Sequence, residues 1–132
     1  MPKFSKTSQS KLDTCDKRLQ LLFSVVVQRY DCTVLEGQRS AAKQNAAFKA
    51  GKSKLKYPKS KHNKKPSLAV DVAPYDNRKV DFSASQCYHF VGYVKAVADT
   101  LGIPIRCGAD WDNDNDVNDQ TFNDLVHFEL KV

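Results

Sequence analysis

The sequence contains no apolar run approaching the roughly 20 residues that a membrane-spanning helix needs, so it predicts no membrane span. Its first residues, Met1 to Ser5, also lack the apolar segment of a signal peptide. We therefore expect the protein to be made and folded in a cytoplasm. If it acts outside that compartment, another device must release it.

Several motifs of common enzyme and metal-binding classes are also absent. There is no Gly-x-Ser-x-Gly, no P-loop and no dinucleotide-binding fingerprint. No Cys-x-x-Cys pair is present, which argues against a zinc knuckle or a thioredoxin-type redox site. In a reducing compartment the four cysteines are expected to be free, mostly buried and without a catalytic role: Cys15, Cys32, Cys87 and Cys107.

The charges are divided between two segments. From Gly37 to Val70 there are ten Lys or Arg and no acidic residue, whereas from Cys107 to Val126 there are six Asp and no basic residue. The basic segment suits an anionic polymer such as nucleic acid or bacterial cell wall, and the acidic segment suits a cation. The two segments could also attract each other.

With 132 residues the chain is long enough for one domain with a hydrophobic core and too short for two. Apolar periodicity predicts helices at 10–28, 40–50 and 83–101, and short strands at 32–36, 68–73, 103–107 and 126–132. Capping boxes are expected at Ser10 with Asp13 and at Ser83 with Gln86. Because the order lacks a βαβ rhythm, we expect an α+β fold with helices packed on a small, mainly antiparallel sheet.

One carboxylate is placed unusually in the predicted strand 68–73. Asp71 shares a strand face with two alanines, and an unpaired buried carboxylate is costly. A metal ion shared with His62 would satisfy it, and so would a lysine or arginine from elsewhere in the chain.

The last predicted strand carries a second polar face. His127 and Glu129 share that face, and Asp124 precedes the strand in a turn. Two histidines and one carboxylate are a common catalytic zinc set, and a further carboxylate close by can take a proton from water. His62 and Asp71 would complete such a set, although a histidine taken alone is more often structural than a metal ligand.

The combination of these motifs resembles a known family. Ser60-x-His62, Ala69-x-Asp71 and Asp124-x-x-His127 occur in the order found in zinc peptidases that cut peptidoglycan stem peptides. These include VanY-type D-alanyl-D-alanine carboxypeptidases and phage L-alanyl-D-glutamate endolysins of the hedgehog/DD-peptidase fold. The likeness runs from about Phe4 to Val132, supported by the segments Gly37–Ser40, Gly108–Trp111 and His127–Leu130.

The resemblance implies a role for each matching residue. Asp124 would be the general base, and Arg39 would stabilise the oxyanion or hold the substrate. Ser60 would contact the substrate or support the first metal ligand. The implied cofactor is Zn²⁺, and its ligands would be His62, Asp71 and His127.

The resemblance also implies a substrate, bacterial peptidoglycan, with no nucleic acid expected. We expect residues 1–132 to form a single, monomeric zinc peptidase domain without a separate cell-wall-binding domain. The first expectation is an L-alanyl-D-glutamate endopeptidase that acts on the cell wall after release, as a phage or prophage endolysin. A D-alanyl-D-alanine carboxypeptidase is the alternative, and a non-catalytic basic module that binds cell wall or nucleic acid is the second.

The acidic segment resembles an incomplete EF-hand loop. Asn115 stands at the sixth position, where glycine is usual, and Thr121 at the twelfth in place of glutamate. We expect this loop to bind Ca²⁺. Binding would order the loop and so help to place Asp124. The alternative is a loop that is solvated or paired with the lysine-rich segment. Oxygen-bearing side chains occupy the odd positions one to nine: Asp110, Asp112, Asp114, Asp116 and Asn118.

Three further residues have two interpretations each. Trp111 could line a substrate groove or anchor the acidic loop. Glu129 could support His127 or pair with a lysine. His89 is expected to be a packing or surface residue.

Overall fold

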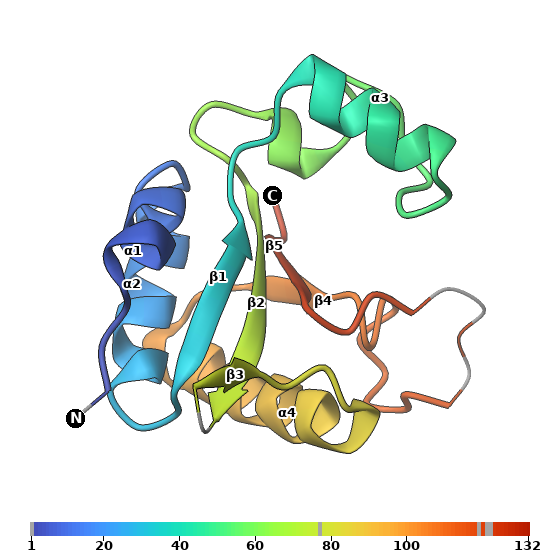
Figure 1. The fold of residues 1–132 in the computed structure, drawn as a ribbon. Coiled ribbons are helices and arrows are strands. Elements are labelled where there is room, and N and C mark those ends of the chain that lie inside the picture. The colour runs from blue at the N-terminus through green and yellow to red at the C-terminus, as the bar shows by residue number, and fades with distance from the viewer. Residues whose placement is uncertain (1, 77, 119, 121–122) are drawn as a thin grey trace.

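An antiparallel sheet runs through the middle of the molecule, and its strands lie in the order β1-β2-β5-β4, with β3 paired to the far end of β2 (Figure 1). The structure is a computed structural model that describes residues 2–76, 78–118, 120 and 123–132. The strands are β1 Cys32–Glu36, β2 Ala69–Asp76, β3 Lys79–Val80, β4 Ile105–Cys107 and β5 His127–Leu130. The helices are α1 Lys6–Leu12, α2 Lys17–Val27, α3 Ala41–Lys49, the 3₁₀ turn η1 Lys61–Asn63 and α4 Ala84–Leu101.

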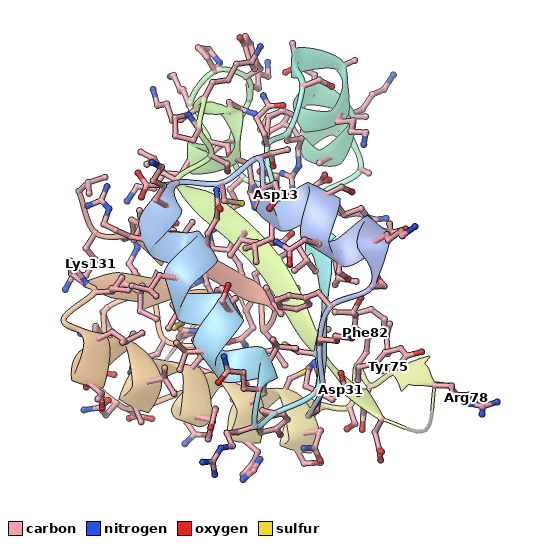
Figure 2. All side chains as sticks on the ribbon, turned by 90° about the vertical axis from the view of Figure 1, so that its left-hand side faces the viewer. Asp13, Asp31, Tyr75, Arg78, Phe82 and Lys131 are labelled. Carbon is pink, nitrogen blue, oxygen red and sulfur yellow. The ribbon has the colours of Figure 1, made fainter. Side chains whose placement is uncertain are left out.

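The first predicted helix, at 10–28, is wrong as one element, because the chain breaks between α1 and α2 (Figure 2). Ser5 caps α1, which ends at Asp13, and the carboxylate of Asp16 caps α2 by accepting the Arg18 N–H. The predicted capping box at Ser10 does not form, since the Ser10 hydroxyl donates to a carbonyl inside α1. Sequence periodicity does not reveal the break, because apolar residues on both sides of it pack in the same hydrophobic core.

The ends of α3 and α4 follow the sequence signals. Ser40 caps α3 through its side chain, and both following glycines, Gly51 and Gly102, adopt the left-handed conformation with φ of 76° and 71°. The predicted capping box at Ser83 is wrong: Ser83 makes no side-chain capping bond, and the Gln86 amide donates to the Tyr30 hydroxyl.

Strand β2 extends past its predicted end at Ala73 and runs through Pro74. Pairing of β2 with β5 covers only Ala69 to Asp71, so the sheet no longer needs an N–H from Pro74 on that side. Among the described residues no helix is both long enough and apolar enough to cross a bilayer.

Alternate residues of β2 and β5 separate the core from the polar face. Helices α2 and α4 pack on one face, where the Phe128 ring lies 5.3 Å from Phe23 and 6.0 Å from Phe90 between ring centroids. The opposite face carries Asp71 and His127, which are paired across the two strands. This opposite face is where the predicted site residues meet.

Candidate active site

His62 is held by η1, a turn that was not predicted inside the lysine-rich loop. The Ser60 hydroxyl accepts the His62 N–H at 3.2 Å, and the Asn63 side chain accepts the Ser60 N–H at 3.1 Å. Ser60 is buried, and its hydroxyl contacts the backbone of the first predicted metal ligand. The sequence signal was present as Ser-x-x-Asn, a variant of the capping box.

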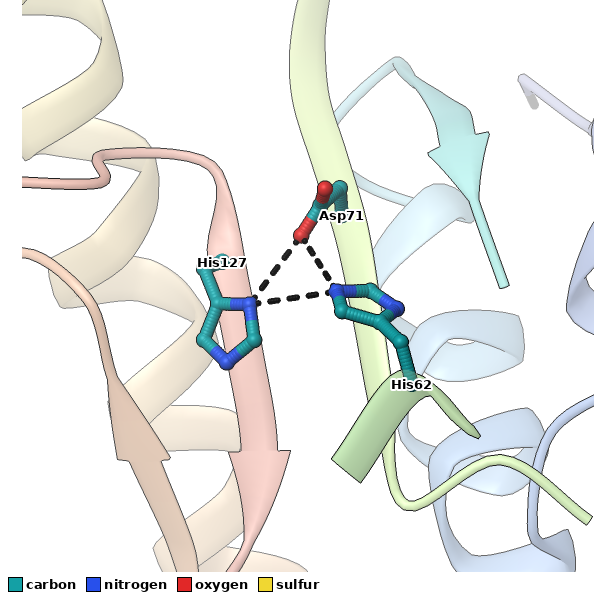
Figure 3. Close-up of side chains that lie close together, drawn as sticks. All are labelled: His62, Asp71 and His127. Carbon is teal, nitrogen blue, oxygen red and sulfur yellow. Dashed lines mark hydrogen bonds and ion pairs between the residues drawn. The ribbon is translucent and has the colours of Figure 1, made fainter. Parts of the chain in front are cut away.

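Three side chains from η1, β2 and β5 form a small triangle (Figure 3). His62 Nε2 lies 3.1 Å from Asp71 Oδ1, His127 Nδ1 lies 3.2 Å from the same oxygen, and the two nitrogens are 3.3 Å apart. Ligand atoms that each lie about 2.0–2.1 Å from a tetrahedral ion are about 3.3–3.4 Å from one another. The spacing therefore matches three ligands of a zinc ion.

The other ring nitrogens of both histidines are engaged, which fixes where their lone pairs point. His62 Nδ1–H donates to the Gly37 carbonyl at 2.8 Å, and His127 Nε2–H donates to Glu129 Oε1 at 2.9 Å. In the neutral histidines the facing nitrogens, beside Asp71, are then acceptors. Metal-binding histidines have this arrangement of outer partners, so the residues present fit a zinc ion.

The electrostatics of the triangle favour a positive charge at its centre. Burial raises the pKa of Asp71, but hydrogen bonds from His127 and His62 outweigh burial and hold that pKa well below its usual range. Burial lowers the pKa of His127, but Asp71 and Glu129 outweigh it and raise that pKa to about 9. A proton and a metal ion would therefore compete for the same ring nitrogen, His127 Nδ1.

Asp124 lies beside the triangle and is placed by close contact with Gly108. Its backbone N–H donates to the Gly108 carbonyl at 3.1 Å, while the Gly108 N–H donates to the His127 carbonyl at 2.8 Å. A Cβ on Gly108 would lie 2.1 Å from the Asp124 carbonyl oxygen, so only glycine fits. Burial, and then the charge of Asp71, raise the pKa of Asp124, which makes it a stronger base than an exposed aspartate.

Arg39 occupies the other side of Asp71. Its guanidinium lies 3.5 Å from Asp71 Oδ2 and 3.5 Å from Glu36, and it donates to the Gln44 side chain at 2.9 Å. Its backbone N–H donates to the His62 carbonyl at 2.7 Å, which ties it to η1. Sequence reasoning did not single out Glu36, which lies three residues before Arg39 at the end of β1, or Gln44, which lies on α3.

Glu129 combines both of its predicted roles. Besides accepting from His127, it receives Lys61 Nζ at 3.0 Å and Arg106 Nη2 at 3.0 Å on its second oxygen. Arg106 lies over the Trp111 ring at 5.2 Å, and that ring lies 5.3 Å from His127. Lys61 and Arg106 were missed by sequence reasoning, since they meet Glu129 only through the folding of η1 and the pairing of β4 with β5.

One cleft of about 740 Å³ is lined by the three residues of the triangle together with Arg39, Asp124 and Glu129. Trp111 lies in its wall. His89 lies at the surface, where it contacts the Tyr30 hydroxyl, as predicted. The lining carries seven Lys or Arg against four Asp or Glu, so the cleft favours an anionic ligand.

The acidic loop brings together three of its predicted ligands. Carboxylate oxygens of Asp110, Asp112 and Asp114 lie within 4.8 Å of one another, while Asp116 lies outside this group and accepts the Asn118 N–H. Asn115 adopts the left-handed conformation expected at the sixth position, with φ of 64°. The predicted twelfth position, Thr121, lies outside the described residues.

A lysine from α4 already contributes positive charge to this loop. Lys95 Nζ lies 3.0 Å from Asp110 Oδ2 and 3.0 Å from Asn115 Oδ1. Asp110 is buried, and burial raises its pKa, but the hydrogen bond and charge of Lys95 together with the Asn115 N–H outweigh burial and lower that pKa. Among the described residues, the ion pair of the loop is therefore made with α4 and not with the lysine-rich segment.

Comparison with known proteins identifies the family. A family model described as phage L-alanyl-D-glutamate peptidase matches residues 1–131. The chain belongs to this family. The L-alanyl-D-glutamate peptidase of Escherichia phage T5 is 34% identical over 122 residues, which cover 89% of this chain and 88% of that protein. The family resemblance predicted from the sequence is confirmed.

A solved structure has a fold similar to that of this chain. The L-Ala D-Glu endopeptidase ChiX of Serratia marcescens matches with a TM-score of 0.78 and 23% identity, over 98% of this chain and 90% of that chain. At this identity the match concerns the fold, and it confirms the predicted hedgehog-like α+β architecture.

Proposed function

We propose that the protein is a zinc-dependent endopeptidase that hydrolyses the amide bond between L-alanine and D-glutamate in peptidoglycan stem peptides. The observation that carries the proposal is the triangle of His62, Asp71 and His127, whose lone pairs converge at the spacing of zinc ligands. Membership of the phage L-alanyl-D-glutamate peptidase family supports the choice of bond over the terminal D-alanyl bond. It also favours an enzyme over a non-catalytic binding module.

The chain's own residues have distinct tasks in this reaction. When bound, zinc would supply Lewis acidity, which would polarise the scissile carbonyl and lower the pKa of a water molecule to about 7. Asp124 takes the proton of the attacking water and delivers it to the leaving amine of D-glutamate. Arg39 faces the carbonyl oxygen, which gains negative charge during the attack. Glu129 keeps the His127 ring in the metal-binding orientation.

The experiment measures zinc content and products together. The metal is stripped by a chelator and zinc alone is restored, and digested peptidoglycan is analysed by mass spectrometry. We expect one zinc per chain, activity that returns with zinc, and fragments that begin with D-glutamate. Release of free D-alanine would instead indicate the carboxypeptidase, and zinc-independent binding without turnover would indicate the binding module.

We propose in addition that the acidic loop binds calcium. The grouping of Asp110, Asp112 and Asp114, and the left-handed Asn115, support this proposal. The loop precedes Asp124 in the chain, so its ordering would help to place the base. Lys95 competes with a cation for the same oxygens, and its removal therefore gives the sharpest test.

A further inference from the structure

Arg106 is fixed at the edge of the active-site cleft, and one side of its guanidinium has no partner among the described residues. Its Nε and Nη2 groups both donate to Glu129 Oε2, at 3.2 and 3.0 Å, and its guanidinium carbon lies 5.2 Å from the centre of the Trp111 ring. Within the described part of the chain, Nη1 makes no hydrogen bond. The side chain is 43% exposed and lines the same cleft as the metal triangle.

The charges around Glu129 leave a positive excess at this place. Its Oε2 atom accepts from Arg106 and also from Lys61, at 3.0 Å each, so one carboxylate faces two cations. Lys61 in addition donates to the Leu130 carbonyl. Arg39, on the other side of the cleft, lies within 3.5 Å of two carboxylates and carries no such excess. An anionic group of the ligand would therefore be attracted to Arg106.

Arg106 is close in sequence to the residue that holds Asp124, which is the proposed proton donor to the leaving amine. It precedes Cys107 and Gly108, and Gly108 holds the segment of Asp124 through the 3.1 Å backbone hydrogen bond. In the proposed mechanism Asp124 delivers its proton to the amine of D-glutamate. Glutamate has two carboxyl groups and only one of them continues the peptide, so the other remains as a free anion on the residue that carries this amine.

We propose that Arg106 binds the free carboxylate of the D-glutamyl residue and so determines which stem peptides the enzyme accepts. This inference rests on the proposed function and adds the residue that recognises the leaving side. An arginine suits the task because its planar fork can hold Glu129 and a second carboxylate at the same time. Stem peptides in which this carboxylate is converted to an amide would be poor substrates.

The test compares two synthetic peptides that differ only in this group: L-alanyl-D-glutamyl-L-lysine linked through the side-chain carboxyl, and the same peptide with the free carboxylate amidated. We expect zinc-loaded wild type to favour the carboxylate peptide by roughly 10- to 100-fold in kcat/KM, the range for a hydrogen bond between charged groups. Arg106→Gln should lose most of its kcat/KM on the carboxylate peptide and little on the amide, so that the preference approaches one. Arg106→Lys should retain part of the preference.

A control variant separates recognition from a general loss of positive charge. Lys59→Met removes another positive charge from the cleft lining and leaves the contacts of Arg106 with Glu129 in place. It should keep the preference, with zinc content equal to wild type. The proposal is overturned if wild type does not discriminate, if Arg106→Gln slows both peptides equally, or if Lys59→Met also abolishes the preference. Failure of the proposed function would differ, because zinc-loaded wild type would then cut neither peptide.

Discussion

At the scale of single residues, Asp124 is the side chain whose role can be tested most cleanly. It lines the cleft but lies outside the triangle of His62, Asp71 and His127, so its replacement should leave the metal in place. We predict that Asp124→Asn keeps one zinc per chain and lowers kcat by roughly 10²- to 10⁴-fold, the usual contribution of a general base. Metal analysis and turnover of the same preparation check this. Normal lysis of cell walls by the variant would remove Asp124 from the mechanism.

The matched control for this prediction is His127→Ala. It should lose zinc and activity together, because the triangle then lacks one of its three ligand atoms. The contrast between the two variants separates proton transfer from metal binding.

Single residues also show what the sequence could and could not predict. The structure brings together His62, Asp71 and His127, which were predicted as a set from the resemblance of their motif order to a known family. Strand alternation placed only Asp71 and His127 on polar faces. Lys61 and Arg106 could not be found, since a lysine in a run of lysines and an arginine in a short strand carry no local signal. Their shared partner, Glu129, was noted beside His127, but its contact with Arg106 follows only from the register of β4 on β5.

At the scale of elements, the loop between β4 and β5 depends on the close approach of Gly108 to Asp124. We predict that Gly108→Ala displaces the Asp124 segment, because the added Cβ would lie 2.1 Å from a backbone oxygen. The variant should lower the free energy of unfolding by about 1–3 kcal/mol and lower kcat more than zinc affinity. Denaturant unfolding and kinetics on one preparation check both parts. Gly92→Ala is the control, since a Cβ there meets nothing within 4 Å.

The acidic loop gives the second prediction at this scale. Lys95→Met leaves the buried carboxylate of Asp110 without its cation, which should destabilise the calcium-free protein by about 3–5 kcal/mol. If the loop binds calcium, the ion replaces the ammonium, so added calcium should restore the melting temperature and bind the variant more tightly than wild type. The melting temperatures of the variant and of wild type, measured with and without calcium, check this prediction. An equal loss of stability in both conditions would mean that Lys95 is the only cation that the loop uses.

Helix boundaries were predicted well where a local signal decided them and poorly where tertiary contact did. Gly51 and Gly102 end α3 and α4 through their own conformation, which a sequence displays directly. The break at Asp13 to Asp16 is held by hydrogen bonds between this turn and Ser67, at 2.8 and 2.9 Å, and that partner lies far along the chain. Periodicity alone cannot reveal such a break, because it records only which residues face the core.

At the scale of the whole molecule, the proposed zinc ligands join segments that are distant in the chain. His62 and His127 are separated by 65 positions, and η1 leads back into a lysine-rich segment with exposed Lys52, Lys54 and Lys56. A metal bound to the triangle would close this segment onto β2 and β5, as ligands that bind only the folded state do. We predict that chelation lowers the melting temperature and exposes the segment to trypsin first.

Limited proteolysis with and without zinc, followed by mass analysis of the first fragments, checks this prediction. Cleavage should begin between residues 52 and 65 in the zinc-free protein. Arg18 is the internal reference, because it is exposed, lies in α2 away from the triangle and should be cut at the same rate in both states. Equal cleavage of the lysine-rich segment with and without zinc would show that the metal has no structural effect there.

If the triangle binds zinc as proposed, one ion would both take part in the reaction and hold the lysine-rich segment against the sheet. Loss of zinc would stop hydrolysis and, at the same moment, open the region richest in protease sites. A host that starves the peptidase of zinc would thus convert a lytic agent into a substrate for its own proteases, and the inactive form would not accumulate.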